Sequence, residues 1–156
     1  MPMTLKLALR DAALVAVAIL LWQWSHQLDA VVSSYRIPIA ILAGMMIPIA
    51  GFLAHEWGHL IGALVGGARV HMPERLLTLF LFDFKPAENG RQQYLSLSAG
   101  GFIASGLVVA LLLVGLSFNH LADQIALGLT ALGVIATFVI EMPPAWRVYR
   151  GGPLPQ

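Results

Sequence analysis

Five consecutive residues in the middle of the chain have the types and the spacing of a metal-dependent hydrolase: His55, Glu56, Trp57, Gly58 and His59. Residues four apart on an α-helix differ in direction by only about 40°, so the two histidines project from one face and can hold one metal ion. Glu56 lies about 100° round from His55, which lets it reach a metal-bound water without being a ligand. The pattern predicts a zinc hydrolase, in which two imidazoles hold Zn²⁺ and the carboxylate takes the proton of the attacking water.

Composition places this motif in a membrane protein. Of the 156 residues, 58% are hydrophobic and only 11% are charged, and the mean hydropathy is +0.79. These values predict an all-α integral membrane protein that forms a single domain over residues 1–156. A net charge of +1 without a basic run argues against a nucleic-acid partner. The chain has no cysteine, so histidine and carboxylate side chains must bind any metal.

Hydrophobic segments predict four transmembrane helices, at about residues 7–28, 37–65, 95–118 and 121–142. The second of these contains the two histidines and Glu56, which are costly to place in hydrocarbon and therefore point to a function there. Pro143 and Pro144 are expected to stop the fourth helix.

A β-hairpin, or re-entrant segment, is expected between the second and third helices, at about residues 68–97. Leu76 to Phe84 has the length and the composition of a strand, and Gln92 to Leu97 follows the turn signal Asn89-Gly90. The alternative is a short interfacial helix that ends at Pro86. The strand from Leu76 to Phe84 is a candidate substrate-binding element, because an exposed strand edge can pair with an extended peptide.

The distribution of basic residues predicts the orientation of this multi-pass protein. Four spans put both termini on the same side as the predicted hairpin, and only Arg36 falls on the opposite side. The positive-inside rule therefore places the termini and the hairpin in the cytoplasm. The other eight of the nine basic residues share that side: Lys6, Arg10, Arg69, Arg75, Lys85, Arg91, Arg147 and Arg150.

Glu141 is the predicted third metal ligand. His55 lies about 18 residues into the second predicted span and Glu141 about 20 residues into the fourth, so both reach a similar depth from the outer side. A catalytic zinc needs a third protein ligand, and an unpaired carboxylate in a membrane is costly. The alternative is that Glu141 extends to the interface or pairs with Arg147 or Arg150. Candidates that fall in predicted loops are weaker: His71, Asp83, His120 and Asp123.

Small residues recur every four positions along the second predicted helix, at Ala54, Gly58, Gly62 and Gly66. Gly101 and Ser105 begin a comparable stripe on the third. Such stripes let neighbouring helices approach closely in lipid. Here they either set the width of the zinc cleft or serve ordinary helix packing.

These residues together resemble the site-2 protease family of intramembrane zinc metalloproteases. The stretch from Leu97 to Ser105 looks like the family's Ala-Gly-Pro-x-x-Asn helix start, with Gly101 in place of Pro and Ser105, one position further along, in place of Asn. The resemblance implies zinc bound by His55 and His59, and cleavage of the transmembrane segments of membrane-protein substrates within the bilayer. It also implies that Glu56 is the catalytic base.

The chain departs from the family at the usual third ligand, an Asp in a Pro-Pro-Leu-Asp-Gly stretch. Residues 142–147 read Met-Pro-Pro-Ala-Trp-Arg, so Trp146 stands where that Asp is expected and Glu141 lies five residues earlier. Either Glu141 substitutes for the Asp, or the chain is a non-catalytic zinc-binding pseudoprotease that binds transmembrane partners.

Overall fold

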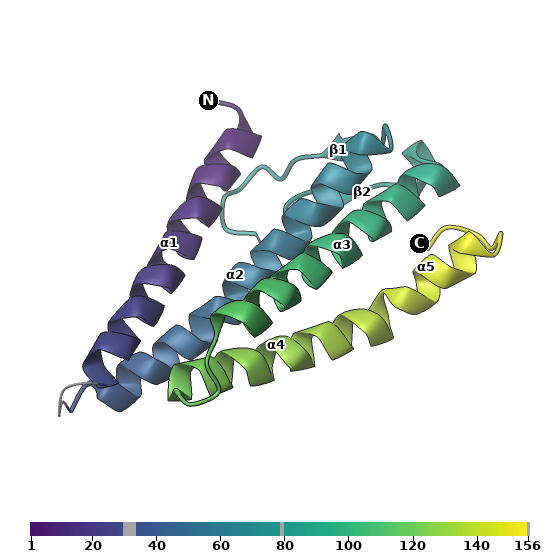
Figure 1. The fold of residues 1–156 in the computed structure, drawn as a ribbon. Helices are drawn as coiled ribbons and strands as arrows, with labels where there is room; N and C mark the ends of the chain where they lie inside the picture. Colours follow the sequence, from purple (N-terminus) through teal and green to yellow (C-terminus); the bar gives the residue numbers. More distant parts are fainter. Residues whose placement is uncertain (30–33, 79, 156) are drawn as a thin grey trace.

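A computed structural model of the chain shows a helical bundle (Figure 1), and it describes residues 1–29, 34–78 and 80–155. The elements in chain order are α1 (Met3–Asp29), α2 (Arg36–Val65), β1 (Val70–His71), β2 (Asp83–Phe84), the 3₁₀ turn η1 (Pro86–Glu88), α3 (Arg91–Gly115), α4 (Leu121–Ile140) and α5 (Met142–Tyr149).

Within the described part of the chain, three helices are long and apolar enough to cross a membrane: Arg36–Val65, Arg91–Gly115 and Leu121–Tyr149. Their lengths of 30, 25 and 29 residues exceed the roughly 20 residues that span a hydrocarbon core. Many of their large apolar side chains point outward, including Leu111 and Val114 on α3 and Ile140 on α4. An outer surface of this kind suits lipid rather than water. The first predicted span corresponds to α1, which is not among the three, and its membrane crossing stays a prediction.

The central helix of the bundle is α2, which packs against α1, α3 and α4. Its small-residue stripe faces α3. A Cβ at Gly58 would lie 2.5 Å from the Cβ of Ala104, and a Cβ at Gly62 would overlap the carbonyl oxygen of Ser96. Two helix backbones can come this close only where side chains are missing, so the stripe determines how near α3 lies to the histidines.

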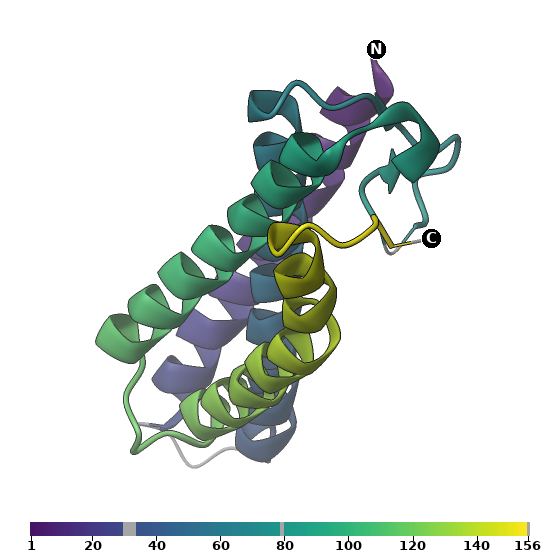
Figure 2. The same ribbon diagram turned by 90° about the vertical axis from the view of Figure 1, so that its right-hand side faces the viewer.

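Two views agree on how the ends of the bundle are arranged. The N-terminus, the β1–β2 pair and α5 lie toward one end, while the last turn of α1, the first turn of α2 and the α3–α4 connection lie at the other (Figures 1 and 2). Because four antiparallel helices return the chain to the end where it began, both termini and the β strands lie at the same end of the bundle. The side of the membrane that this end faces stays a prediction.

The predicted hairpin is wrong in its second strand. Gln92 to Leu97 belong to α3, and β1 pairs instead with β2 in an antiparallel register of Val70 with Phe84 and His71 with Asp83. The reason lies at Gly90, where the backbone N–H donates to the side chain of Gln93 and so caps the start of a helix. The Asn-Gly pair therefore starts a helix rather than a hairpin.

Asn89 closes the segment between β1 and α3. Its side-chain oxygen accepts from the Arg69 N–H at 2.7 Å, and its amide nitrogen donates to the carbonyl oxygens of Arg69 and Lys85. Beside it, His71 Nε2 lies 2.9 Å from Glu88, and this hydrogen bond lowers the pKa of the exposed Glu88 carboxyl.

The predicted strand from Leu76 to Phe84 is also largely absent, because only Asp83–Phe84 is a strand; residue 79 lies outside the described residues. Backbone groups of this segment bond to side chains of distant helices instead of to a partner strand. Arg10 of α1 donates to the carbonyl oxygens of Leu76 and Thr78, and the N–H of Leu81 donates to Glu56 of α2.

The fourth predicted span is interrupted at the residue that matters most for the site. The helix α4 ends at Ile140, and the prolines that were expected to stop it occupy the first turn of α5. Proline fits there because the first N–H groups of a helix have no intrahelical partner. Glu141 lies at the junction, between two helices that follow nearly one path (Figure 1).

Candidate metal centre

Three side chains from two separate parts of the chain meet at one point. His55 Nε2 lies 2.9 Å from His59 Nε2 and 3.1 Å from one carboxylate oxygen of Glu141, and His59 Nε2 lies 3.2 Å from the other oxygen. Among the residues that the structure describes, this is the group of three or more histidine and acidic side chains that could hold a metal ion. The expected convergence of Glu141 with the two histidines is therefore present.

Hydrogen bonds to Nδ1 of each histidine determine how Nε2 of the same ring faces Glu141. His55 Nδ1 lies 3.0 Å from the carbonyl oxygen of Gly101, and His59 Nδ1 lies 2.9 Å from that of Leu97. A carbonyl only accepts, so each Nδ1 carries the hydrogen that it donates there, and in the neutral form of each ring Nε2 then holds a lone pair. In that form two lone pairs and the Glu141 carboxylate face one another, an arrangement that a cation stabilises.

Glycines of α3 make this orientation possible. A Cβ at Gly101 would overlap the imidazole of His59, and one at Gly100 would overlap the carbonyl oxygen of Gly58. Without these side chains, α3 brings the carbonyl oxygens of Leu97 and Gly101 within hydrogen-bond distance of the rings. The small residues of α3 therefore affect the position of the histidine rings as well as the packing of α3 against α2.

Ser105 is a further partner of His55, with its Oγ 2.8 Å from Nδ1. Nδ1 therefore has two oxygen partners, Ser105 and Gly101, and both favour the same ring orientation.

Glu56 is buried beside the histidines and has a different environment from Glu141. One of its oxygens accepts the N–H of Leu81 at 3.4 Å, and the side chain of Leu81 is almost fully buried. The segment between the two strands thus covers this carboxylate. Glu56 is not a member of the three-residue group.

An acidic residue of α1 fixes the middle of the motif. The indole N–H of Trp57 donates to Asp11 at 2.9 Å, and Asp11 also pairs with Arg10 at 2.7 Å. Asp11 is buried. Its link to Trp57 left no local signal in the sequence, because the two residues are 46 positions apart.

The alternatives for Glu141 and for the missing Asp can be compared directly. The ion pairs that Glu141 makes are with His55 and His59 rather than with Arg147 or Arg150. Trp146 stacks on Tyr149 with 5.5 Å between ring centroids and leaves 54% of its surface exposed, so it takes no part in the group.

The weaker candidates lie elsewhere. Asp123 belongs to the first turn of α4, is fully buried, and accepts from the Trp22 indole and from the N–H of Ser117. It was expected in a loop, and its contacts are those of a residue that joins helices. His71 and Asp83 face each other across the two strands. The remaining weak candidate is His120, whose ring centroid lies 4.2 Å from that of His26.

Comparison of the chain with models of protein families, with curated proteins and with solved structures finds no match.

Proposed function

We propose that this chain is a multi-pass membrane zinc endopeptidase that hydrolyses peptide bonds in or near the transmembrane segments of its substrates, in the manner of the site-2 protease family. The observation that carries the proposal is the meeting of His55, His59 and Glu141 beside Glu56, on helices apolar enough to cross a membrane. A metal group in such helices is costly unless it is used.

The donor set fits zinc. Two imidazole nitrogens and a carboxylate are ligands that zinc accepts, and three protein ligands leave the fourth position open, as in catalytic sites. Zinc bonds of about 2.0–2.1 Å in a tetrahedron put ligand atoms roughly 3.3 Å apart. The separations here, 2.9, 3.1 and 3.2 Å, are only slightly shorter. The chemistry that the ion supplies when bound is Lewis acidity toward water and toward the scissile carbonyl.

The chain's own residues supply the rest of the mechanism. Glu56 accepts one proton of the attacking water while the water oxygen bonds to the scissile carbonyl carbon. Glu56 then delivers that proton to the leaving nitrogen as the C–N bond breaks. The Leu81 N–H fixes one oxygen of Glu56. Glu141 keeps 34% of its side chain accessible while His55 keeps 7%, so the group is open on the Glu141 side.

A substrate helix must unwind before it is cut, because a helical peptide bond is enclosed by its own turn. Residues that weaken helices, such as Gly, Pro or Asn near the cut, are therefore expected to favour cleavage. The alternative proposal is a pseudoprotease that binds zinc and transmembrane partners without turnover. Its basis is the absence of the family's Asp, and the proximity of Glu141 to both histidines weakens that basis.

The variant Glu56→Gln tests the proposal. We expect it to retain about one zinc per chain, because Glu56 is not a ligand, and to lower the cleavage rate at least about 10²–10⁴-fold, which is the usual contribution of a general base. Zinc content by atomic absorption and cleavage of single-span reporters in micelles are the two measurements. Unchanged cleavage in Glu56→Gln would contradict the mechanism. Wild-type protein that binds zinc and partners but cuts no reporter would favour the pseudoprotease.

A further inference from the structure

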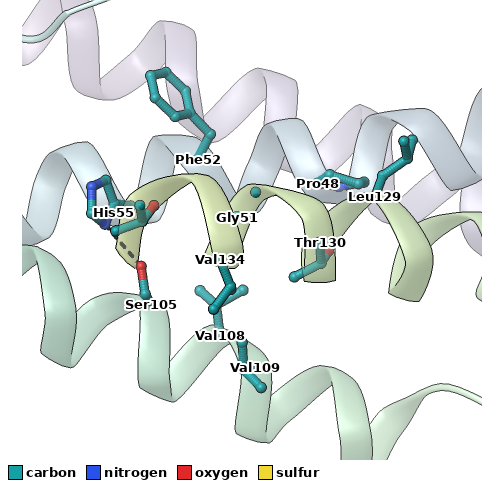
Figure 3. Close-up of a pocket in the computed structure, with 12 residues that line it drawn as sticks. Pro48, Gly51, Phe52, His55, Ser105, Val108, Val109, Leu129, Thr130 and Val134 are labelled. Atoms are coloured by element: carbon teal, nitrogen blue, oxygen red, sulfur yellow. Dashed lines mark hydrogen bonds between the residues drawn. The ribbon is translucent and has the colours of Figure 1, made fainter. Parts of the chain in front are cut away.

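A pocket of about 100 Å³ lies beside the metal group, between α2, α3 and α4. His55 and Ser105, joined by their hydrogen bond, form one end of this pocket, and Pro48 and Leu129 form the other (Figure 3). The pocket therefore shares a wall with one of the proposed zinc ligands.

Residues one helical turn before the proposed metal ligands line the pocket, on α2 and on α4. Gly51 precedes His55 by four residues on α2, and Thr137 precedes Glu141 by four on the α4 side, where its carbonyl oxygen accepts the Glu141 N–H at 2.8 Å. A group held in the pocket would thus lie within one helical turn of both ligands.

The walls are mostly apolar, and Val108 and Val134 lie in the pocket's middle (Figure 3). One exception is Thr130, whose hydroxyl is buried without a hydrogen-bond partner among the described residues. A buried hydroxyl normally has a hydrogen-bond partner. The pocket therefore favours an apolar side chain whose own peptide backbone lies close enough to bond to Thr130.

We propose that this pocket is a specificity site for one aliphatic side chain, of valine to leucine size, from a residue next to the scissile bond of the transmembrane substrate. The inference rests on the proposed function. An apolar cavity of about 150 Å³ is large enough to bind benzene, so a pocket of about 100 Å³ suits an occupant of about four carbon atoms. That is too little for an aromatic ring or a lipid chain, and an apolar lining does not hold water well.

Gly133 offers a direct way to fill the pocket. It lines the pocket, and a Cβ built there meets nothing within 4 Å, so an added side chain enters open space instead of colliding with a neighbour. Gly128, on the same helix, also has nothing within 4 Å of a Cβ but is not among the pocket's lining residues. Gly128→Leu is therefore a matched control for Gly133→Leu.

The first experiment measures side-chain preference. The probes are single-span model peptides in detergent micelles, with a central Asn-Gly pair, that differ only in carrying Ala, Leu or Phe at successive positions around the cut. We expect wild type and Gly128→Leu to prefer Leu over Ala and Phe at one position by about tenfold or more, and Gly133→Leu to prefer Ala there. An unchanged preference in Gly133→Leu, or an equal loss on every peptide, overturns the inference.

The second experiment measures binding without turnover. Because the chain has no cysteine, Val134→Cys in the Glu56→Gln background provides one thiol in the pocket, and peptides carrying a single cysteine at successive positions are tested for disulfide formation. We expect crosslinking at one peptide position, and none with Gly128→Cys. Crosslinking at that position without cleavage by wild type would refute the protease and leave the pocket standing. Cleavage without side-chain preference or positional crosslinking would refute the pocket and leave the protease standing.

Discussion

Two glutamates beside the same pair of histidines differ in what they contact. Glu141 lies 3.1 and 3.2 Å from the two Nε2 atoms, whereas an oxygen of Glu56 accepts the N–H of Leu81. A ligand must point at the metal and a base must reach the water beside it, so these contacts assign Glu141 and Glu56 to different tasks in the proposed mechanism.

Ser105 is expected to act on the metal through His55. Partners of a ligating histidine orient its ring, and their removal typically costs about 10–100-fold in metal affinity or activity. For Ser105→Ala we expect zinc affinity to fall by about tenfold, the lower end of that range, because Gly101 still accepts from the same nitrogen. Competition with a chromogenic chelator measures this change. Ser105→Thr, which keeps the hydroxyl, serves as the control, and equal affinity in Ser105→Ala and wild type would contradict the assignment.

At the level of helices, α3 positions the histidines through the absence of side chains. A methyl group at Gly101 would overlap the ring of His59, whereas one at Gly106 meets nothing within 4 Å. Gly101→Ala is therefore expected to displace His59 and lower zinc content. Gly106→Ala should keep zinc and gain about 0.5–1 kcal/mol in helix stability, since alanine is the better helix former. Zinc per chain and thermal unfolding in micelles measure the two effects. Full zinc in Gly101→Ala would show that the contact does not position the ring.

Local rules predicted the parts of the site that local geometry controls. The four-residue spacing of His55 and His59 and the similar depths of His55 and Glu141 follow from the rise and twist of an α-helix, and the structure brings the three side chains together. The strand from Leu76 to Phe84 could not be predicted correctly, because its backbone bonds to Arg10 and Glu56, which are distant in sequence. Such contacts leave no periodic signal.

At the level of the whole molecule, the bundle groups both termini with the β strands at one end (Figures 1 and 2). The predicted four spans and the excess of basic residues at that end give the sidedness to be tested. Single cysteines at Asn89 and Asn119 report it without background, because the chain has no cysteine. An impermeant maleimide should label Asn89→Cys only from the cytoplasmic side and Asn119→Cys only from outside. Labelling of both from one face would contradict the four-span arrangement.

The central claim is that His55, His59 and Glu141 form one metal site, and zinc content tests it most directly. We expect purified wild type to hold about one zinc per chain. Glu141→Ala should lose most of it, as His55→Ala should, because each removes one of three protein ligands. Glu141→Asp keeps the charge with a shorter reach and should bind partially, and Glu74→Ala, at an exposed position, controls for loss of a surface carboxylate. Membrane insertion of every variant is checked by fractionation. The predicted result is loss of most zinc in His55→Ala and Glu141→Ala, partial binding in Glu141→Asp and full binding in Glu74→Ala, and full zinc occupancy in Glu141→Ala would contradict the claim.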